Sequence, residues 1–167
     1  MSADAQGHSS SVNSVAFSHD SARLASASHD STVKIWDASS GECLQTLKGH
    51  SYPVTSVVFS HDSARLASAS QDSTVKIWDT SSGECLRTLY GHSDWVTAVA
   101  FSHDSALLAS ASHDSTVMIW DVSSGECQQT IRTGRELSNI SFDVTGLYFH
   151  TNIGTIIVSA SPALNII

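Results

Sequence analysis

The chain repeats itself with a period of 42 residues. The period is marked by two dipeptides, Gly-His at positions 7, 49 and 91 and Trp-Asp at positions 36, 78 and 120. The first two copies, residues 7–48 and 49–90, differ at eight positions, and the third, residues 91–132, has drifted slightly further. A fixed period of this length is typical of folds that stack small units, each of which covers the apolar face of the next.

Each copy is expected to form four short strands. Apolar and polar residues alternate at every second position, and turn-forming residues interrupt the alternation, which indicates strands and not helices. In the first copy the strands are predicted at residues 12–18, 24–28, 32–37 and 42–47. Val15 and Phe17 share one face of the first strand, whereas Val33 and Ile35 lie on the opposite face of the third strand from Trp36. Each copy is therefore a small antiparallel sheet.

Four-stranded units of this length that carry Gly-His and Trp-Asp resemble the WD-repeat family. The resemblance covers residues 7–132 and implies an all-β fold, the β-propeller, with one four-stranded antiparallel sheet in each blade. Both dipeptides are missing after residue 132, although residues 137–142, 147–151 and 155–159 still look like three strands. We therefore expect a lead at 1–6, full blades at 7–48, 49–90 and 91–132, and a degenerate fourth blade at 133–167.

The resemblance also implies a buried hydrogen-bond network in each blade, formed by a Trp, a Ser or Thr, a His and an Asp. We choose Ser26 over Ser28 because a turn centred on Asp30 would set Ser26 across from Trp36 on the same face. A buried indole N–H needs an acceptor, and such a network satisfies each of its members. The matching residues are His8, Ser26, Asp30 and Trp36; His50, Ser68, Asp72 and Trp78; and His92, Ser110, Asp114 and Trp120.

The repeated histidines, serines and aspartates do not predict an enzyme. His-Asp-Ser recurs as adjacent residues in turns, for example at 19–21 and 61–63, whereas a catalytic triad converges from separate elements onto one cleft. Cys43, Cys85 and Cys127 stand one per copy, so they form neither a zinc cluster nor a disulfide framework. Single glycines at turns give no phosphate-binding loop. We expect no catalytic residue, no metal and no cofactor.

Charge and hydropathy narrow the range of partners. The net charge of −8 provides no positive field for nucleic acid or anionic lipid. Residues 1–7 show no signal-peptide pattern, and the longest apolar-rich stretch, 155–167, is too short to span a bilayer. We expect a cytoplasmic protein that binds neither nucleic acid nor membranes.

Positions at which the copies disagree point to a binding surface, because a position that varies among near-identical copies is not dictated by their shared core. In WD-repeat proteins the matching positions lie on one rim of the propeller, where partners commonly dock. Tyr52 and Trp95 are of the residue types that dominate protein-binding hot spots. The alternative is that these are tolerated loop substitutions. The candidate partner-binding residues are Ser11, Asn13 and His29; Tyr52, Pro53, Thr55 and Gln71; and Asp94, Trp95, Thr97 and His113.

The leading interpretation is a non-catalytic scaffold that binds a protein or peptide on this rim. The segments Ala-Phe-Ser-His-Asp-Ser at 16–21 and Ser-Ser-Gly-Glu-Cys at 39–43 further resemble the repeats of fungal NACHT-type signalling ATPases of the vegetative-incompatibility kind. That resemblance implies a sensor region, although none of the ATPase is present in this sequence. The alternative is an architectural or truncated propeller with no partner of its own.

The number of repeats raises a question of closure. Closed propellers usually have four to eight blades, and an open end would leave the apolar faces that carry Val15, Phe17, Val33 and Ile35 partly uncovered. Three solutions exist: additional repeats in a longer chain, self-association of two copies, or a strained four-bladed ring closed by the fourth blade. We favour additional repeats, because residues 1–6 carry no strand that could complete a closing sheet.

Overall fold

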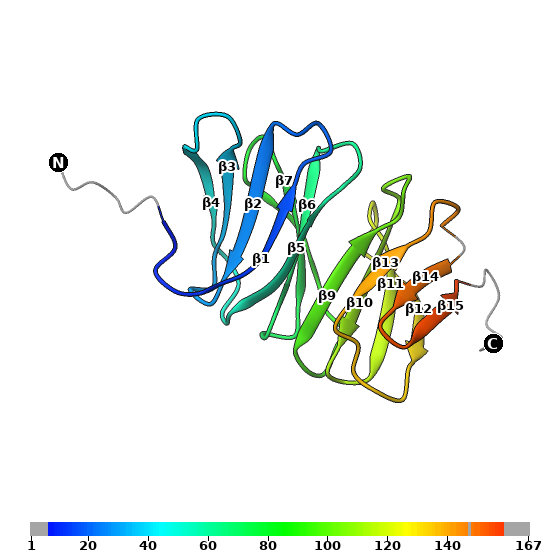
Figure 1. The fold of residues 1–167 in the computed structure, drawn as a ribbon. Coiled ribbons are helices and arrows are strands. Elements are labelled where there is room, and N and C mark those ends of the chain that lie inside the picture. The colour runs from blue at the N-terminus through cyan, green and yellow to red at the C-terminus, as the bar shows by residue number, and fades with distance from the viewer. Residues whose placement is uncertain (1–6, 147, 159–167) are drawn as a thin grey trace.

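The described residues of the computed structural model, 7–146 and 148–158, form an all-β chain of four antiparallel sheets arranged as successive blades (Figure 1). The first three sheets have four strands each and the fourth has three. This confirms the predicted fold class and the degenerate character of the fourth blade. No helix in the described part of the chain is long and apolar enough to cross a membrane.

The strands follow the repeat with a constant spacing. The first sheet contains β1 (Val12–Phe17), β2 (Arg23–Ser28), β3 (Val33–Asp37) and β4 (Cys43–Leu47). The second contains β5 (Val54–Phe59), β6 (Arg65–Ser70), β7 (Val75–Asp79) and β8 (Cys85–Leu89). The third contains β9 (Val96–Phe101), β10 (Leu107–Ser112), β11 (Thr116–Asp121) and β12 (Cys127–Arg132). In the first copy these bounds differ from the predicted ones by one residue at most.

Serine and aspartate close the turns between the strands. In the turn from β1 to β2, Ser18 Oγ donates a hydrogen bond to Asp20 Oδ1 over 2.6 Å, and the same oxygen accepts the backbone N–H of Ala22. Ser21 ends this turn with φ of 60°, in the left-handed region. In the turn from β3 to β4, Asp37 Oδ1 accepts the backbone N–H groups of two serines, and Gly41 supplies φ of 75°. The aspartate of each Trp-Asp dipeptide is thus a turn residue.

The core lies between neighbouring blades and not within any one of them. Ala25, Ala27, Val33 and Ile35 of the first blade are fully buried against the second. The second blade meets them with Val57, Phe59, Leu66 and Trp78. The same two kinds of face meet again between the second and third blades. Each blade therefore has a trailing face of small and β-branched residues and a leading face of larger ones, including Phe and Trp.

The fourth sheet consists of β13 (Ile140–Phe142), β14 (Tyr148–Thr151) and β15 (Gly154–Ile157). It covers the trailing face of the third blade with Ile140, Phe149 and Ile156. Of the segments expected here, residues 147 and 159 lie outside the described residues, as does the lead at 1–6. The blades form an open arc with the first and fourth sheets at opposite ends, so the strained four-bladed ring is not the arrangement of this chain (Figure 1).

One apolar face of the arc is open, and its composition differs from the expectation. Val15 and Phe17 on the leading face of the first blade are exposed, as expected, but Val33 and Ile35 are not left uncovered. Both belong to the trailing face, which the second blade buries completely. The expectation was wrong for this pair because the register of the sheet places Val15 and Phe17 on the side of Lys34 and Trp36, while Val33 and Ile35 lie on the other side, which the second blade covers.

Because the copies are so alike, they offer a matched test of this packing. Phe59 is 1% exposed between two blades, whereas its counterpart Phe17 is 65% exposed. We expect Phe59→Ala to lower the free energy of unfolding by about 3–5 kcal/mol, the usual cost of removing a buried ring. Phe17→Ala should cost less than about 1 kcal/mol. Urea unfolding followed by circular dichroism measures both, and equal losses would contradict the packing described here.

Candidate functional site

A buried hydrogen-bond network runs across each full blade, and the second blade shows it most completely. Trp78 Nε1 donates to Ser68 Oγ over 2.9 Å. Ser68 Oγ lies 2.8 Å from His50 Nε2, and His50 Nδ1 lies 2.8 Å from Asp72 Oδ2. Trp78, Ser68 and His50 are all buried. The network ties the third strand, the second strand and the Gly-His segment to the turn between β6 and β7.

The protons of this network can be assigned from the donors that it contains. If His50 carries its proton on Nδ1, it donates to the Asp72 carboxylate, and Nε2 is free to accept. Ser68 then donates its hydroxyl proton to Nε2 while its oxygen accepts the indole N–H. One chain of donation from Trp78 to Asp72 therefore satisfies each of these groups.

The same geometry recurs in the other two full blades. In the first, Ser26 Oγ lies 2.6 Å from His8 Nε2 and accepts from Trp36 over 2.8 Å. In the third, Ser110 Oγ lies 2.7 Å from His92 Nε2 and accepts from Trp120 over 2.8 Å. His8 and His92 bind Asp30 and Asp114 over 2.9 and 2.8 Å. The structure thus brings together all the network residues proposed from the sequence.

One detail differs from the expectation. Ser26 does not lie directly across from Trp36: its register partner is Lys34, and Leu24 is opposite Trp36. Ser26 and Trp36 are diagonal neighbours on one face, within reach because the indole is long. Ser28 instead accepts the backbone N–H of Asp30 and donates to the carbonyl of Ser10, so it belongs to the turn.

A threonine extends each network and was missed by the sequence reasoning. Thr74 donates its hydroxyl proton to Asp72 Oδ1 over 2.6 Å, and its backbone N–H binds the same oxygen. Thr32 and Thr116 do the same for Asp30 and Asp114. The signal was available in the sequence, because Asp-Ser-Thr occurs in all three copies.

These bonds keep the network carboxylates ionised. Burial alone raises the pKa of Asp72, but hydrogen bonds from His50 and Thr74 outweigh it and hold the pKa well below the ordinary 3.8. Since the pKa falls on folding, the resulting stability is complete above the ordinary pKa and is lost as the pH drops toward the folded-state value. The network is therefore a stabilising element throughout the neutral range.

The order Ser, His, Asp has the connectivity of a hydrolase triad, but the arrangement does not present a nucleophile. Ser68 is fully buried, and its oxygen already accepts the indole N–H of Trp78. A substrate carbonyl cannot reach it, and a triad needs an accessible serine beside an oxyanion hole. Within the described residues, no group of three or more His, Cys, Asp or Glu side chains is placed to hold a metal ion.

The variable residues lie at the end of the blades where the second strand turns into the third. In each blade the chain after Gly-His pairs there with the residue that precedes the network Asp. His29, Gln71 and His113 donate their backbone N–H groups to the carbonyls of Ser11, Pro53 and Trp95, over 2.9, 3.0 and 2.9 Å. The loops that contain these three pairs form one rim of the arc, which we call the Gly-His rim.

The aromatic residues of the Gly-His rim are accessible. Tyr52 is 60% exposed and Trp95 is 46% exposed. The Trp95 ring packs edge-on against His113 with 5.5 Å between ring centroids, and His113 Nδ1 lies 2.7 Å from a carboxylate oxygen of Glu136. Glu136 was not among the candidates, because it lies between the third and fourth blades, outside the repeat. Through its pair with His113, Glu136 adds a polar contact near Trp95, and Asp94 is exposed next to Trp95.

Three candidate residues serve instead to join the blades. Asn13, Thr55 and Thr97 are the extra residues of a bulge at the start of the first strand of each blade. Asn13 Nδ2 donates to the carbonyl of Val54 over 2.8 Å, and Thr55 Oγ1 donates to the carbonyl of Val96 over 2.5 Å. Thr97 Oγ1 donates to the carbonyl of Leu137 over 2.7 Å. A bulge re-aims a side chain, here toward the next blade.

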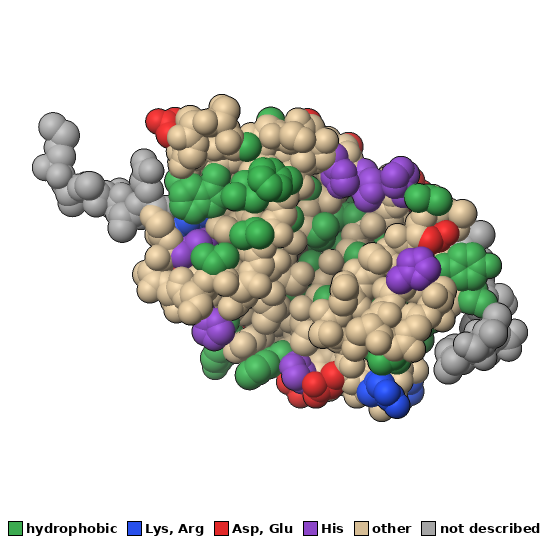
Figure 2. Space-filling view, in the orientation of Figure 1, with side chains coloured by type: hydrophobic (Ala, Val, Ile, Leu, Met, Phe, Trp, Pro, Cys, Tyr) green, Lys and Arg blue, Asp and Glu red, His purple; other side chains and the backbone are tan. Residues whose placement is uncertain are grey.

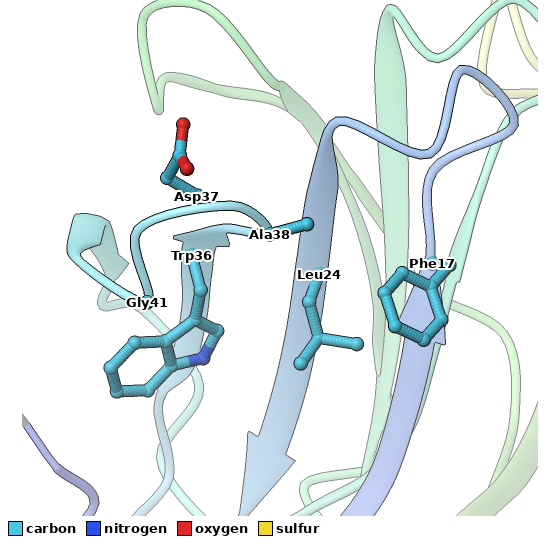
Figure 3. Close-up of a pocket in the computed structure, with 6 residues that line it drawn as sticks. All are labelled: Phe17, Leu24, Trp36, Asp37, Ala38 and Gly41. Carbon is cyan, nitrogen blue, oxygen red and sulfur yellow. The ribbon is translucent and has the colours of Figure 1, made fainter.

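The open leading face of the first blade forms a shallow apolar pocket of about 280 Å³. Figure 3 shows Phe17, Leu24 and Trp36 on this face, next to the turn that contains Gly41. Figure 2 shows hydrophobic side chains gathered over the same strands. In the second blade the equivalent residues Phe59, Leu66 and Trp78 are covered by the first blade. The pocket is thus the equivalent of a blade-docking face, and no blade formed by the described residues covers it.

Comparison with known proteins agrees with this geometry. The family model described as WD domain, G-beta repeat matches residues 3–37, 41–79 and 83–121, more than half of the chain. The chain belongs to the WD-repeat family. WD repeats form a general protein-interaction scaffold family that is typically non-catalytic.

Individual relatives match single repeats. The chain is 52% identical over 42 residues to the WD40 repeat-containing protein smu1 of Dictyostelium discoideum, which covers 25% of this chain and 8% of that protein. It is 51% identical over 41 residues to Periodic tryptophan protein 2 of Saccharomyces cerevisiae, covering 25% and 4%. It is 64% identical over 36 residues to the Vegetative incompatibility protein HET-E-1 of Podospora anserina, covering 22% and 3%. The matched segments thus span less than a tenth of each relative, while the repeats resemble those of HET-E-1.

The network offers a second matched test. Ser68→Ala would leave the buried Trp78 N–H and His50 Nε2 without a partner, which should lower the free energy of unfolding by about 1–3 kcal/mol. Ser26→Ala should cost less, because Trp36 lies on the open face, where water can reach the indole. Urea unfolding of the two variants measures the difference. A larger loss for Ser26→Ala than for Ser68→Ala would show that burial of the indole does not set the cost.

Proposed function

We propose that this chain is a non-catalytic protein-interaction scaffold that binds a protein or peptide on the Gly-His rim. The observation that carries the proposal is the exposure of Trp95, whose ring packs edge-on against His113, which in turn pairs with Glu136. An aromatic side chain that is accessible and already fixed loses little conformational freedom on binding. The proposal extends to a place as the sensor region of a NACHT-type signalling protein and to a cytoplasmic location; what supports it is the 64% identity of 36 residues to the vegetative incompatibility protein, which is a likeness of the repeats.

The hydrogen-bond network beneath the Gly-His rim allows the side chains of the rim to change. The network residues that hold the rim loops are constant among the copies, while Ser11, Pro53 and Trp95 differ at the same position of the repeat. The backbone hydrogen bonds of the rim are the same in the three blades, so a change of side chain at this position leaves the loop in place. The rim can therefore vary without loss of the fold.

A second surface, the open leading face of the first blade, is proposed to receive a further WD repeat. The first blade, which occupies the leading face of the second, shows what such an occupant contributes: the Arg23 guanidinium donates to the carbonyl of Ser63 over 2.9 Å, and Gln45 Nε2 donates to the carbonyl of Ser81 over 2.7 Å. A Cβ added at Gly83 would collide with Gln45 of the preceding blade, whereas one added at the equivalent Gly41 would meet nothing within 4 Å. The first blade therefore has the same turn at Gly41, but no described residue occupies the space beside it where a neighbouring blade would pack.

Self-association of two copies head to tail fits this face less well. The outer face of the fourth sheet carries Ser141, His150 and Thr155 in one exposed cross-strand row, next to the pair of Tyr148 and Ile157 on the same face. Placing this polar row on Phe17 and Trp36 would bury polar groups without partners.

Rim recognition can be tested with peptides selected from a displayed random library against the full chain. We expect Trp95→Ala to weaken the selected peptides at least about tenfold, since hot-spot aromatics contribute 2 kcal/mol or more. Leu86→Ala, which removes an exposed apolar residue from the outer strand β8, should leave affinity unchanged. Fluorescence polarisation measures both affinities, with melting temperatures as the folding control. Peptides that bind the Trp95→Ala variant as tightly as the parent chain would contradict the proposal.

The open face can be tested by fusing a second copy of residues 49–90 ahead of Gly7 in the full chain. The added blade should cover Phe17 and Trp36 and raise the free energy of unfolding by more than about 2 kcal/mol, since burial of one large apolar side chain contributes about that much. A matched fusion whose added copy carries Ile77→Asp should show no such gain, because Ile77 lies on the trailing face. Light scattering of the parent chain distinguishes docking of a further repeat from self-association. A dimer of the parent chain that Phe17→Asp abolishes would favour self-association of two copies at this face.

A further inference from the structure

Three histidines, one from each full blade, form a row on the rim opposite the Gly-His rim. His19, His61 and His103 occupy the same position in the turns that join the first and second strands of each blade. The rings of His19 and His61 are stacked with 4.2 Å between centroids, and those of His61 and His103 meet edge-on at 4.4 Å. Figure 2 shows histidine side chains gathered along this edge of the molecule.

The row coincides with the contact between the turns of adjacent blades. The backbone N–H of Asp20 donates to Ser63 Oγ over 3.3 Å, and the backbone N–H of His61 donates to Ser105 Oγ over 3.0 Å. Each of these bonds links one blade to the next. The two ring contacts, one stacked and one edge-on, therefore lie at the two junctions between the full blades, and the spacing of the turns sets the spacing of the rings.

His61 is the central member and the least accessible. His19 and His103 are exposed, whereas His61 is partly buried, and its Nδ1 is buried with no hydrogen-bond partner. A neutral ring tolerates this position, but protonation would put a second N–H donor or a positive charge where neither is compensated. Burial is the main cause that lowers the pKa of His61, followed by the charges that His19 and His103 would carry; Asp62 acts in the opposite direction.

Charged groups of both signs surround the row, and Asp62 acts in favour of a protonated His61. Asp20, Asp62 and Asp104 are held by the serine hydroxyls of their own turns. The Arg23 guanidinium crosses the first junction to the carbonyl of Ser63, which adds a fixed cation next to the His61 turn. The titratable and charged groups facing His61 are His19, Asp20 and Arg23 from the first blade, Asp62 and Arg65 from its own turn, and His103 and Asp104 from the third.

We propose that the row formed by His19, His61 and His103 is an acid-sensitive joint, which keeps the three blades in contact while its rings are neutral and loosens the blade junctions when they are protonated. Neutral imidazoles stack favourably, whereas adjacent imidazolium ions repel one another across both junctions. The joint goes beyond partner binding, because it lies on the opposite rim and acts on the packing of the blades.

The direction of the pH effect follows from linkage. The folded-state pKa of His61 lies below the ordinary value of 6.5, so the unfolded chain binds the proton more tightly. The contribution of neutral His61 to stability is complete above pH 6.5, declines as the pH falls below it, and levels off below the folded-state pKa. The blades should accordingly loosen in mildly acidic solution.

A proton NMR titration of the imidazoles in the full chain tests the coupling directly. His61 should titrate below 6.5 in the parent chain, and in the double variant His19→Gln, His103→Gln its midpoint should move upward, because both neighbouring charges are gone. His150, exposed on the fourth sheet, serves as the internal reference. A His61 midpoint at or above 6.5, or one that does not move in the double variant, would overturn the proposal.

Urea unfolding at pH 7.5 and 5.0 tests the consequence for stability. His61→Phe keeps a flat ring in the row but removes the titrating group. The rise in the unfolding equilibrium constant between pH 7.5 and 5.0 should therefore be at least ~3-fold smaller in this variant than in the parent chain. One proton can change that constant by about tenfold per pH unit at most. His150→Gln should keep the parent behaviour, and the network histidines cancel because all variants retain them. If His61→Phe does not fold, His19→Gln should show a smaller reduction in the same direction. Identical pH dependence in parent and variants would refute the joint.

Discussion

The structure depends on the burial of one blade by the next. A single four-stranded sheet of this repeat has two apolar faces, and neither can be covered by the other strands of the same sheet. Val33 and Ile35 become fully buried because Phe59 and Trp78 of the following blade lie over them. The hydrogen bonds that cross the junction, such as that from Arg23 to the carbonyl of Ser63, fix the register at which the faces meet. The repeat period is long enough for one sheet, and the sheet is stable only in a stack.

The hydrogen-bond network of each blade provides a partner for a polar group that this burial removes from water. The indole that packs against the preceding blade carries an N–H that cannot reach water once the blade is covered, as the 2% exposure of Trp78 shows. Ser68, His50 and Asp72 carry the hydrogen bonding from this N–H to a carboxylate at the rim. The same residues therefore satisfy the core and hold the loops from which Tyr52 and Trp95 project. Scaffold and binding surface are built by one set of interactions, which lets the rim differ among copies that are otherwise nearly identical.

The two ends and the two rims of the arc are not equivalent. One end is closed by a sheet whose outer row, Ser141, His150 and Thr155, is polar, while the other end shows Phe17 and Trp36 to solvent. One rim carries variable aromatic residues, and the other carries a constant histidine at each blade junction. These differences underlie the separate roles that we propose for the surfaces: partner binding on the Gly-His rim, docking of a further repeat at the open face, and sensitivity to acid at the histidine row.

The number of blades and their strands could be predicted from the sequence alone, because the period and the alternation of residues are local properties that near-identical copies repeat. The network was predicted from the resemblance to the WD-repeat family. It also placed Val15 and Phe17 on an uncovered face. It did not show that Val33 and Ile35 are buried, that Asn13, Thr55 and Thr97 reach across to the next blade, or that Glu136 supports His113. Nor did it indicate that His19, His61 and His103 stack. Each of these depends on the direction in which one blade faces its neighbour, and residues that lie 42 positions apart meet only when the blades are assembled.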